Sequence, residues 1–379
     1  DPELSKVLVP MLVRSNDVAA HAELCGLLRE PDQAVRGAAA EVLRHVGGRS
    51  ALDIVAKLAA DPGFPGRMEA MSALLPRAGV QGMPLIVAVL RGGRLVAQAP
   101  TAGTSQAQLA NWMVGQDVTV PERTPARHVG DVVCALDAVH ARSGRERLAG
   151  ASLRLRAGEI TAIAGVSGNG QLALADLLCG LCAAEAGQVT LAGEPLRDAP
   201  AWLVGMGVAR IPEDRHAVGV VGDLPVWENA VSERLRTPAF TRGPLVRRAA
   251  ARAHARHIVE AYDVRGGGLD APARALSGGN MQKLILGRAL MAPDGRTPRL
   301  IVAHQPTWGL DIGAVAYVQR QLIAARDAGA AVLLLSDDLD EVIALGDRIA
   351  VIHAGHLTEA RPAEAWTREA IGLAMAGSA

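Results

Sequence analysis

Aromatic residues and excess charge are what this sequence most clearly lacks. Phe, Trp and Tyr make up 2% of the 379 residues whereas half of the residues are apolar, so the core must be built from aliphatic side chains. Lys and Arg together number 39, as do Asp and Glu, and the formal net charge is zero. A neutral chain has no bulk electrostatic attraction for nucleic acid or an anionic membrane, and we expect no nucleic-acid partner.

Long apolar runs and a targeting profile are also missing. No apolar run reaches the roughly 18 residues that would span a bilayer. The first residues, Asp1-Pro2-Glu3, do not begin a basic segment followed by an apolar one. A function at a membrane would therefore have to be exercised through a partner.

Cysteine is scarce, and two of the four cysteines form a C-x-x-C motif at Cys179 and Cys182. The motif fits a redox pair, half of a metal site, or two small residues on a buried helix face. No second such motif completes a zinc site. Leucines at helical spacing surround the pair: Leu174, Leu177, Leu178 and Leu181. We predict a helix with both cysteines on its buried face, no metal, and a reducing, cytoplasmic compartment.

Residues 1–80 read as short amphipathic helices that resemble HEAT-type repeats. Two stretches match at a spacing of 31 residues. The matching positions are Leu27, Pro31, Arg36, Ala39 and Leu43 in one stretch and Leu58, Pro62, Arg67, Ala70 and Leu74 in the other. Coincidence between two Ala- and Leu-rich helices is the alternative. A short solenoid of stacked helix pairs would serve to bind a partner.

A second repeat links residues 85–120 to the end of the chain. Five positions recur at one offset without gaps, since 355 − 93 = 262 and every pair differs by the same number. They are Val89, Gly93, Leu95, Met113 and Gly115, which match Val351, Gly355, Leu357, Met375 and Gly377. Strands are expected at 85–90 and 95–97, and a helix at 105–114. The segment looks like the tail of a domain, and a proline-punctuated linker at 121–125 separates it from residues 127–379.

From about residue 130 onward, apolar strands alternate with helical patterns, as a mainly parallel sheet with crossover helices requires. Strands are predicted at 160–164, 299–303, 331–335 and 348–352. The first runs into a glycine-rich loop that opens a helix: Gly165, Val166, Ser167, Gly168, Asn169, Gly170, Gln171 and Leu172. Such a unit places backbone N–H groups and a helix N-terminus on a phosphate, although a plain strand–helix turn is the alternative. The last two positions depart from a working loop, because Gln171 has no charge and Leu172 cannot bind a metal.

Three further motifs follow in order along the chain. They are Ile211-Pro212-Glu213-Asp214-Arg215, Leu276-Ser277-Gly278-Gly279-Asn280-Met281-Gln282-Lys283 and Gln305-Pro306-Thr307-Trp308-Gly309-Leu310-Asp311. With the glycine loop, they make residues 127–379 resemble the second cassette of ABC import ATPases for sugars or nucleosides, with the nucleoside branch closer. The resemblance implies an α/β P-loop cassette with a mainly parallel sheet and a helical subdomain. Such proteins carry two cassettes in one chain, and residues 85–120 resemble the tail of the first.

The resemblance also implies that the catalytic positions of this cassette are degenerate. His304 stands at the metal-binding aspartate, Gln305 at the glutamate that polarises water, and Asp337 at the switch histidine. Gln cannot act as a general base, and a carboxylate at the switch position would repel a γ-phosphate. Glu213 replaces the Q-loop glutamine, and no aromatic residue stands near His140, where the family stacks adenine. We therefore expect weak or purely structural ATP binding at this chain's own site, without a metal.

The signature motif, in contrast, is intact. A Ser-Gly-Gly run at a helix start offers one hydroxyl and open backbone N–H groups to an anion. In the family this element acts across a head-to-tail pair of cassettes. Ser277, Gly278 and Gly279 would therefore contact the γ-phosphate of a nucleotide that a partner cassette holds with its Mg²⁺. The other signature residues acting in trans are Leu276, Asn280 and Gln282. Asp311 would join these contacts, and Trp308 would either do so or pack on the surface.

The resulting hypothesis is the ATP-binding subunit of an importer for nucleosides or simple sugars. The implied partners are a competent first cassette, the transmembrane permease subunits and a solute-binding protein, with the chain on the cytoplasmic face of the membrane. Glu213, Asp214 and Arg215 lie where the family's cassette meets the permease, with ordinary loop residues as the alternative. An interaction scaffold, and a truncated fusion without ATPase activity, are the competing hypotheses.

Overall fold

A computed structural model describes residues 25–29, 35–36, 39–40, 55, 86–91, 94–100, 104–105, 108–109, 111–112 and 125–377. The chain divides into two compact units, Asp1–Asp117 and Val118–Ala379. Most of the HEAT-like pattern at 1–80 lies outside the described residues, and it stays a prediction. Within the described residues, none of the helices has the length and apolar character needed to cross a membrane.

The smaller unit contains a hairpin whose turn has the same register as one in the larger unit, although β2 is longer than its counterpart β14. The strands concerned are β1 (Ile86–Arg91), β2 (Arg94–Pro100), β13 (Arg348–His353) and β14 (His356–Leu357). Arg91 lies opposite Arg94, and His353 lies opposite His356. Adding 262 to the first pair gives the second, so the two hairpins differ by the offset read from the sequence.

The main sheet of the larger unit is largely parallel. Its strand order is β14-β13-β5-β12-β11-β8, and β15 pairs with β13. Besides β13 and β14, the sheet contains β5 (Ile160–Ala164), β8 (Val208–Ile211), β11 (Leu300–His304), β12 (Ala331–Ser336) and β15 (Arg361–Pro362). The strands β8, β11, β12, β5 and β13 run parallel. Every residue of β5, β11 and β12 is buried because both faces of the sheet are covered. All four predicted strands are found within about one residue of their expected bounds.

One face of the main sheet is covered by a helix and an antiparallel sheet. The elements are β3 (Val132–Ser143), β4 (Glu146–Arg156), β6 (Ala184–Leu191), β7 (Glu194–Pro195) and α7 (Gln171–Leu178). The antiparallel order is β4-β3-β6-β7. Leu136, Leu153 and Leu174 pack in one buried cluster with Ile163 of β5. This packing fixes the start of α7, and with it the glycine loop, against the end of β5.

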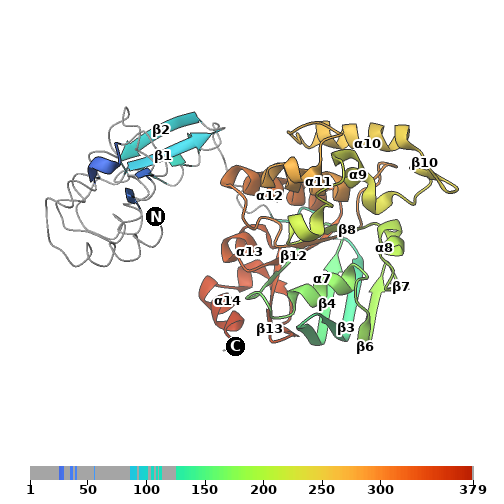
Figure 1. The fold of residues 1–379 in the computed structure, drawn as a ribbon. Coiled ribbons are helices and arrows are strands. Elements are labelled where there is room, and N and C mark those ends of the chain that lie inside the picture. The colour runs from blue at the N-terminus through green and yellow to red at the C-terminus, as the bar shows by residue number, and fades with distance from the viewer. Residues whose placement is uncertain are drawn as a thin grey trace, which may run out of the picture. The chain divides into compact units, whose positions relative to one another are not determined.

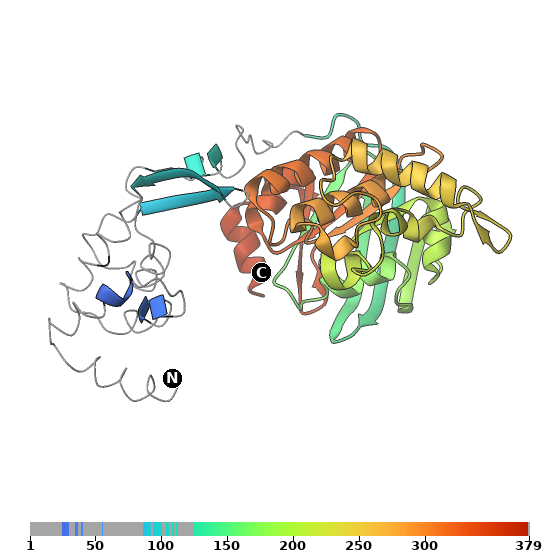
Figure 2. The same cartoon turned by 45° about the horizontal axis from the view of Figure 1, so that its top comes forward.

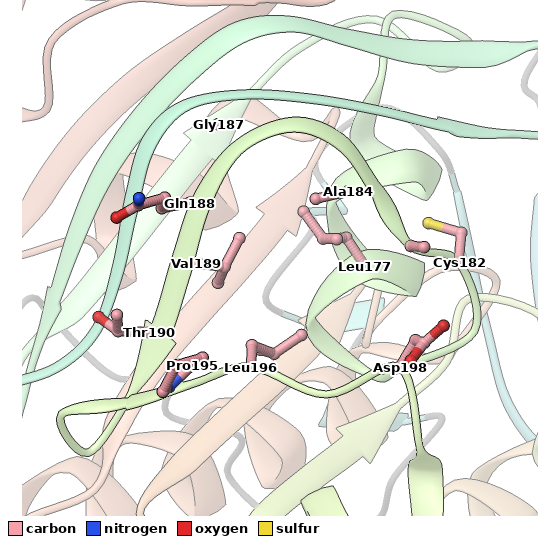
Figure 3. Close-up of a pocket in the computed structure, with 11 residues that line it drawn as sticks. Leu177, Cys182, Ala184, Gly187, Gln188, Val189, Thr190, Pro195, Leu196 and Asp198 are labelled. Atoms are coloured by element: carbon pink, nitrogen blue, oxygen red, sulfur yellow. The ribbon is translucent and has the colours of Figure 1, made fainter.

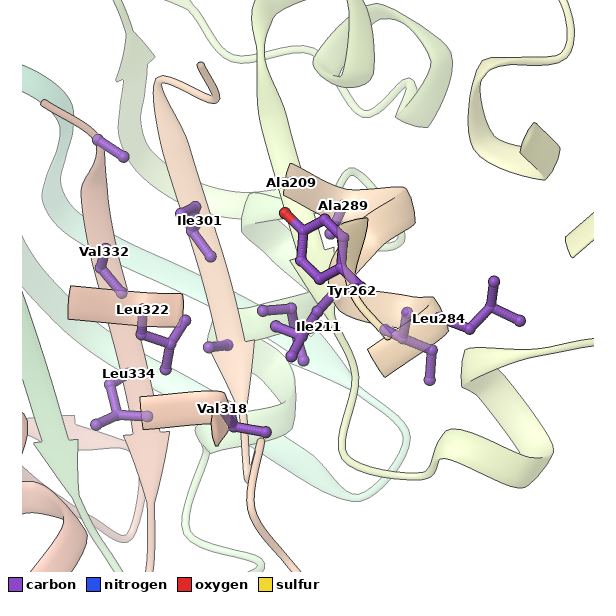
Figure 4. Packing of buried hydrophobic residues seen from close by; sticks show 14 of the residues in the cluster. Ala209, Ile211, Tyr262, Leu284, Ala289, Ile301, Val318, Leu322, Val332 and Leu334 are labelled. Atoms are coloured by element: carbon purple, nitrogen blue, oxygen red, sulfur yellow. The ribbon is translucent and has the colours of Figure 1, made fainter. Parts of the chain in front are cut away.

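The other face carries most of the remaining helices, and the figures show α9, α10 and α11 gathered on the side away from β3, β4 and β6 (Figures 1 and 2). The helices on this face are α9 (Val226–Val231), α10 (Arg248–Ala261), α11 (Gly278–Leu290), α12 (Ile312–Asp327), α13 (Leu339–Leu345) and α14 (Arg368–Met375). Helix α8 (Pro200–Met206) instead packs through Leu203 in the same cluster as α7. Short elements include a π-helix at Arg215–Gly219 and the hairpin of β9 (Thr241–Arg242) and β10 (Leu245–Val246). Ile301 and Val332 of the sheet share a buried cluster with Val318 and Leu322 of α12 (Figure 4).

The prediction that one helix carries both cysteines is wrong for Cys182. Helix α7 ends at Leu178, where Cys179 caps it and Gly180 takes a φ of 70° that stops the helix. Leu181 is 49% exposed beyond this stop. Both thiols are free, and burial raises the pKa of Cys179 to about 12 and that of Cys182 to about 11. Neither is therefore a thiolate near neutral pH, which agrees with a non-redox role.

One carboxylate ties the beginning of the larger unit to its sheet. Asp347, directly before β13, accepts hydrogen bonds from the backbone N–H of Ala126 at 2.9 Å and of Ile160 at 2.8 Å. The guanidinium of Arg326, which is 1% exposed, lies 3.3 Å from the same carboxylate. A charged pair buried with this many hydrogen bonds is held in a single geometry.

Candidate functional site

The glycine loop joins β5 to α7 as predicted, and two of its glycines are required by geometry. Gly168 and Gly170 have φ values of 92° and 120°, which side chains rarely adopt. A Cβ atom on Gly170 would also lie 2.7 Å from the backbone oxygen of Arg147. The loop therefore packs directly against the backbone at the start of β4.

The carboxylate of Glu146, the first residue of β4, is bound to the loop. Its Oε2 accepts hydrogen bonds from the backbone N–H of Gly170 and of Leu172, both at 2.9 Å. These N–H groups belong to the start of α7, where the strand–loop–helix unit would present donors to a phosphate. Sequence reasoning missed Glu146, because it lies 24 residues before Gly170 and belongs to none of the motifs.

Gln171, at the position of the missing lysine, is turned into the loop. Its side chain is 2% exposed, donates to the backbone oxygen of Val166 at 3.1 Å and accepts from the N–H of Asn169 at 3.2 Å. Asn169 in turn accepts from the N–H of Ala354 at 2.8 Å, and its backbone oxygen accepts from Gly355. The loop is thus fastened both to itself and to the turn between β13 and β14.

His304, at the expected metal-binding position, is buried and uncharged. Burial lowers its pKa to about 4, so the imidazole is neutral near pH 7. Its Nε2 lies 3.7 Å from Oε2 of Glu213, and because the histidine is neutral this contact is not an ion pair. The pKa of Glu213 is raised, first by burial and then by the charges of Asp337, Glu146 and Asp214. Several carboxylates therefore lie close to this end of the sheet.

Gln305 and Asp337 follow neighbouring strands, and Asp337 contacts the glycine loop. The N–H of Gln305, which has a φ of 47°, donates to the backbone oxygen of Leu335 at 2.8 Å. The hydroxyl of Ser167 donates to Asp337 at 3.3 Å. Sequence reasoning also missed the buried Glu341, whose pKa is raised by burial.

Glu341 connects the segments that follow β11 and β12. Its carboxylate accepts from the hydroxyls of Thr307 at 2.8 Å and Ser336 at 2.7 Å. Thr307 lies two residues beyond Gln305, and Ser336 directly precedes Asp337. This one carboxylate therefore links the segments that carry Gln305 and Asp337.

As folded here, the site offers only part of what Mg²⁺-ATP requires. Two N–H groups of the loop already bind Glu146, and Gln171 is turned inward. A neutral His304 and the apolar Leu172 supply no anionic or hydroxyl ligand for a hard cation. Within the described residues, no group of three His, Cys, Asp or Glu side chains is arranged to hold a metal ion.

The signature residues, in contrast, begin a regular helix with an exposed serine. Ser277 caps α11, and its hydroxyl accepts from the N–H of Asn280 at 3.4 Å and from Nδ2 of the same residue at 2.9 Å. Gln282 is buried and donates to the backbone oxygen of Pro306 at 2.8 Å. The signature helix and the segment after β11 are thereby held together, while Leu276 packs in the core.

Arg215 joins the coupling motif to the segment after β11. Although it was predicted to lie at a permease contact, its side chain is buried and donates to the backbone oxygens of Trp308 at 2.6 Å and Gly309 at 3.0 Å. A Cβ atom on Gly278 would lie 3.3 Å from Nε of Arg215, so the guanidinium also borders the signature. Asp214 is exposed and caps the π-helix that follows.

Two residues predicted at a cassette interface remain accessible. Trp308 is 60% exposed. Asp311 is exposed and caps α12 by accepting from the N–H groups of Gly313 and Ala314. A partner can therefore reach both residues. Asp311 also lies beside the signature, since its Oδ2 would be 3.9 Å from a Cβ atom on Gly279.

A separate pocket of about 460 Å³ lies beside the antiparallel sheet. Its wall includes Leu177 and Cys182 near the end of α7 and Val189 of β6 (Figure 3). Apart from Cys182, none of the residues of the glycine loop, the signature or the other motifs lines it.

Comparison with known proteins identifies the domain. Residues 148–303 match the model of the ABC transporter family. This chain carries an ABC transporter ATP-binding domain. Solved ABC cassettes agree with this fold. A nucleotide-free cassette is 23% identical with a TM-score of 0.51, over 61% of this chain and 92% of its own. A cassette in the ADP conformation is 22% identical with a TM-score of 0.50, over 65% of this chain and 95% of its own. The mixed sheet with its helices is thus the ABC cassette fold that the motifs predicted.

Curated relatives share more of the sequence. The glucose import ATP-binding protein of Haloferax volcanii is 42% identical over 77% of this chain and 53% of its own length. The guanosine import ATP-binding protein of Bacillus subtilis is 39% identical over 77% and 57%, and the nucleoside import ATP-binding protein of Lactococcus lactis is 35% identical over the same shares. The chain thus spans about half the length of the curated relatives that it matches.

Proposed function

We propose that the chain acts as the second, degenerate cassette of an ABC importer for nucleosides or simple sugars. It donates its signature to the ATP site of a competent first cassette, while its own site binds ATP weakly and does not hydrolyse it. Its further partners are the transmembrane permease subunits and a solute-binding protein, and it works on the cytoplasmic face of the membrane. The names of the relatives, which refer to import of glucose, guanosine and nucleosides, support the solute class.

The contrast between the two nucleotide elements carries this proposal. Ser277 is exposed at the start of an intact helix, with Gly278 and Gly279 beside it. The N–H groups and the hydroxyl at a helix start suit an anion brought by a partner. The chain's own loop, however, meets Glu146 and the inward-turned Gln171. A cassette built in this way is better suited to contribute its signature to the ATP site of a partner cassette than to hydrolyse ATP in its own loop.

The smaller unit supports a two-cassette origin. The matches to the relatives extend over 294–296 residues, more than the 379 − 117 = 262 residues of the larger unit, so they reach into residues before Val118. The shared register of the β1–β2 and β13–β14 hairpins agrees with a first-cassette tail at 85–120. We also propose that residues 85–120 are the tail of a first cassette and that residues 127–379 form the second cassette.

The test measures the Mg²⁺-dependent ATPase rate of the full chain mixed with a competent first cassette whose own signature serine has been changed to arginine. Only this chain can then supply a working signature. We expect Ser277→Arg to lower the rate at least about 100-fold, since a bulky cation replaces the donor of a transition-state contact. Ser152→Arg is the matched control, because Ser152 is also exposed and accepts one backbone N–H. An unchanged rate with Ser277→Arg contradicts the transport hypothesis and favours the scaffold.

A further inference from the structure

Glu146 belongs to no cassette motif, yet its carboxylate holds the phosphate loop. One oxygen, Oε2, accepts from the N–H groups of Gly170 and Leu172 at 2.9 Å each. A negatively charged oxygen at the N-terminus of a helix is favoured by the free N–H groups and by the helix dipole. A phosphate oxygen at this place would use the same two donors.

We propose that Glu146 is a built-in occupant of the phosphate loop, which takes the place of a nucleotide phosphate and so weakens ATP binding at this site. The inference deepens the proposed function: it rests on the weak own site proposed above and supplies its physical cause. The weakening operates through direct competition, because one pair of N–H groups cannot serve both the carboxylate and a phosphate oxygen.

The backbone around the loop leaves Glu146 in a fixed position. The backbone oxygen of Arg147, the next residue, would lie 2.7 Å from a Cβ atom on Gly170. The N–H of Ala149 donates to the backbone oxygen of Gly355 at 2.8 Å, and the N–H of Gly355 donates to Asn169 of the loop. The start of β4, the β13–β14 turn and the loop are therefore hydrogen-bonded to one another, so the carboxylate is supplied by a structured strand end.

The surrounding charges add to this weakening of ATP binding. Asp337 accepts a hydrogen bond from Ser167 of the loop, and Glu213 lies close enough to Glu146 and Asp337 for their charges to raise its pKa. A polyphosphate that displaced Glu146 would meet these carboxylates without the lysine that would offset them, since Gln171 stands in its place. Removal of the Glu146 charge therefore acts in two ways: it frees the donors and weakens the repulsion.

The test compares ATP binding to the full-length chain with binding to its Glu146→Ala and Glu146→Gln variants by isothermal titration calorimetry. Ala removes both charge and acceptor, whereas Gln keeps one acceptor oxygen without the charge. We expect ATP to bind at least about tenfold more tightly to Glu146→Ala than to the natural chain, with a smaller gain for Glu146→Gln. Glu194→Gln, at an exposed carboxylate in β7, is the matched control and should leave binding unchanged.

Inorganic pyrophosphate separates an effect on the loop from one on the adenine side. It should raise the melting temperature of Glu146→Ala and leave that of the natural chain unchanged, since only the variant has free loop N–H groups. The proposal is overturned if both Glu146 variants bind ATP with a dissociation constant within twofold of that of the natural chain. It is also overturned if neither variant binds ATP measurably. If Glu146→Ala does not fold, the same criteria apply to Glu146→Gln. The proposed function fails on a different measurement, the ATPase rate of the cassette pair with Ser277→Arg.

Discussion

The buried His304 should make the cassette sensitive to mild acid. Burial lowers its pKa to about 4 from an ordinary value of 6.5. Between these values the unfolded chain binds a proton that the folded chain rejects, so lowering the pH favours unfolding. The loss of stability begins as the pH falls through 6.5 and levels off below about 4.

The two pKa values set the size of the effect. Relative to pH 7.5, this one group should remove about 2 kcal/mol from the free energy of unfolding at pH 5.0 and about 3 kcal/mol at pH 4.0. The neutral variant His304→Gln has no such proton to bind. Its stability relative to the natural chain should therefore increase by about 2 kcal/mol between pH 7.5 and pH 5.0.

Urea unfolding, followed by tryptophan fluorescence at pH 7.5 and pH 5.0, measures both free energies. Comparing the two proteins cancels the other groups that titrate over this range. His257→Gln, on the exposed face of α10, serves as the control and should keep the acid sensitivity of the natural chain. If His304→Gln and the natural chain lose the same stability between the two pH values, His304 is not a buried neutral imidazole.

Three further outcomes are expected. Gly170→Ala should lower the free energy of unfolding by about 1–3 kcal/mol, because it adds a clash to a φ of 120°; Gly193→Ala, which has a φ of 82° and open space for a Cβ, should lower it less in the same urea titration. Arg215→Lys should destabilise the chain by about 2 kcal/mol in that assay, since a lysine cannot donate to both backbone oxygens. Gln305→Glu should leave phosphate release from Mg²⁺-ATP by the isolated chain at background, because Gln171 and His304 remain in place of a lysine and a metal ligand; a rate clearly above background would contradict the degenerate-site interpretation.

Local patterns predicted much of the cassette correctly. The strand at 160–164 and the loop after it combine a buried apolar run with glycines, and both signals are local in sequence. Helix α7 was overextended to Leu181 because leucine spacing does not show where a glycine stops a helix. Gly180 ends the helix by adopting a left-handed backbone conformation, which glycine does without strain.

Contacts between distant segments are what the sequence could not predict. Glu146 reaches the loop from a strand end 24 residues before Gly170, and no spacing rule relates the two. Arg215 stands in a motif assigned to the permease contact, but its guanidinium turns inward because backbone oxygens after β11 accept its hydrogen bonds. In both cases the partner is a backbone group, which leaves no sign in residue identity.

The contacts of Asp347 show that residues before the first strand of the cassette take part in its fold. Its carboxylate binds the N–H of Ala126 as well as that of Ile160, at the start of β5. Shortened chains that start before Ala126 keep this connection, whereas those that start after it lose one of the hydrogen bonds to a nearly buried carboxylate, which then keeps Ile160 and Arg326 as donors. An expression fragment for crystallisation or calorimetry should therefore retain the last residues of the linker, even though they belong to none of the cassette's strands or helices.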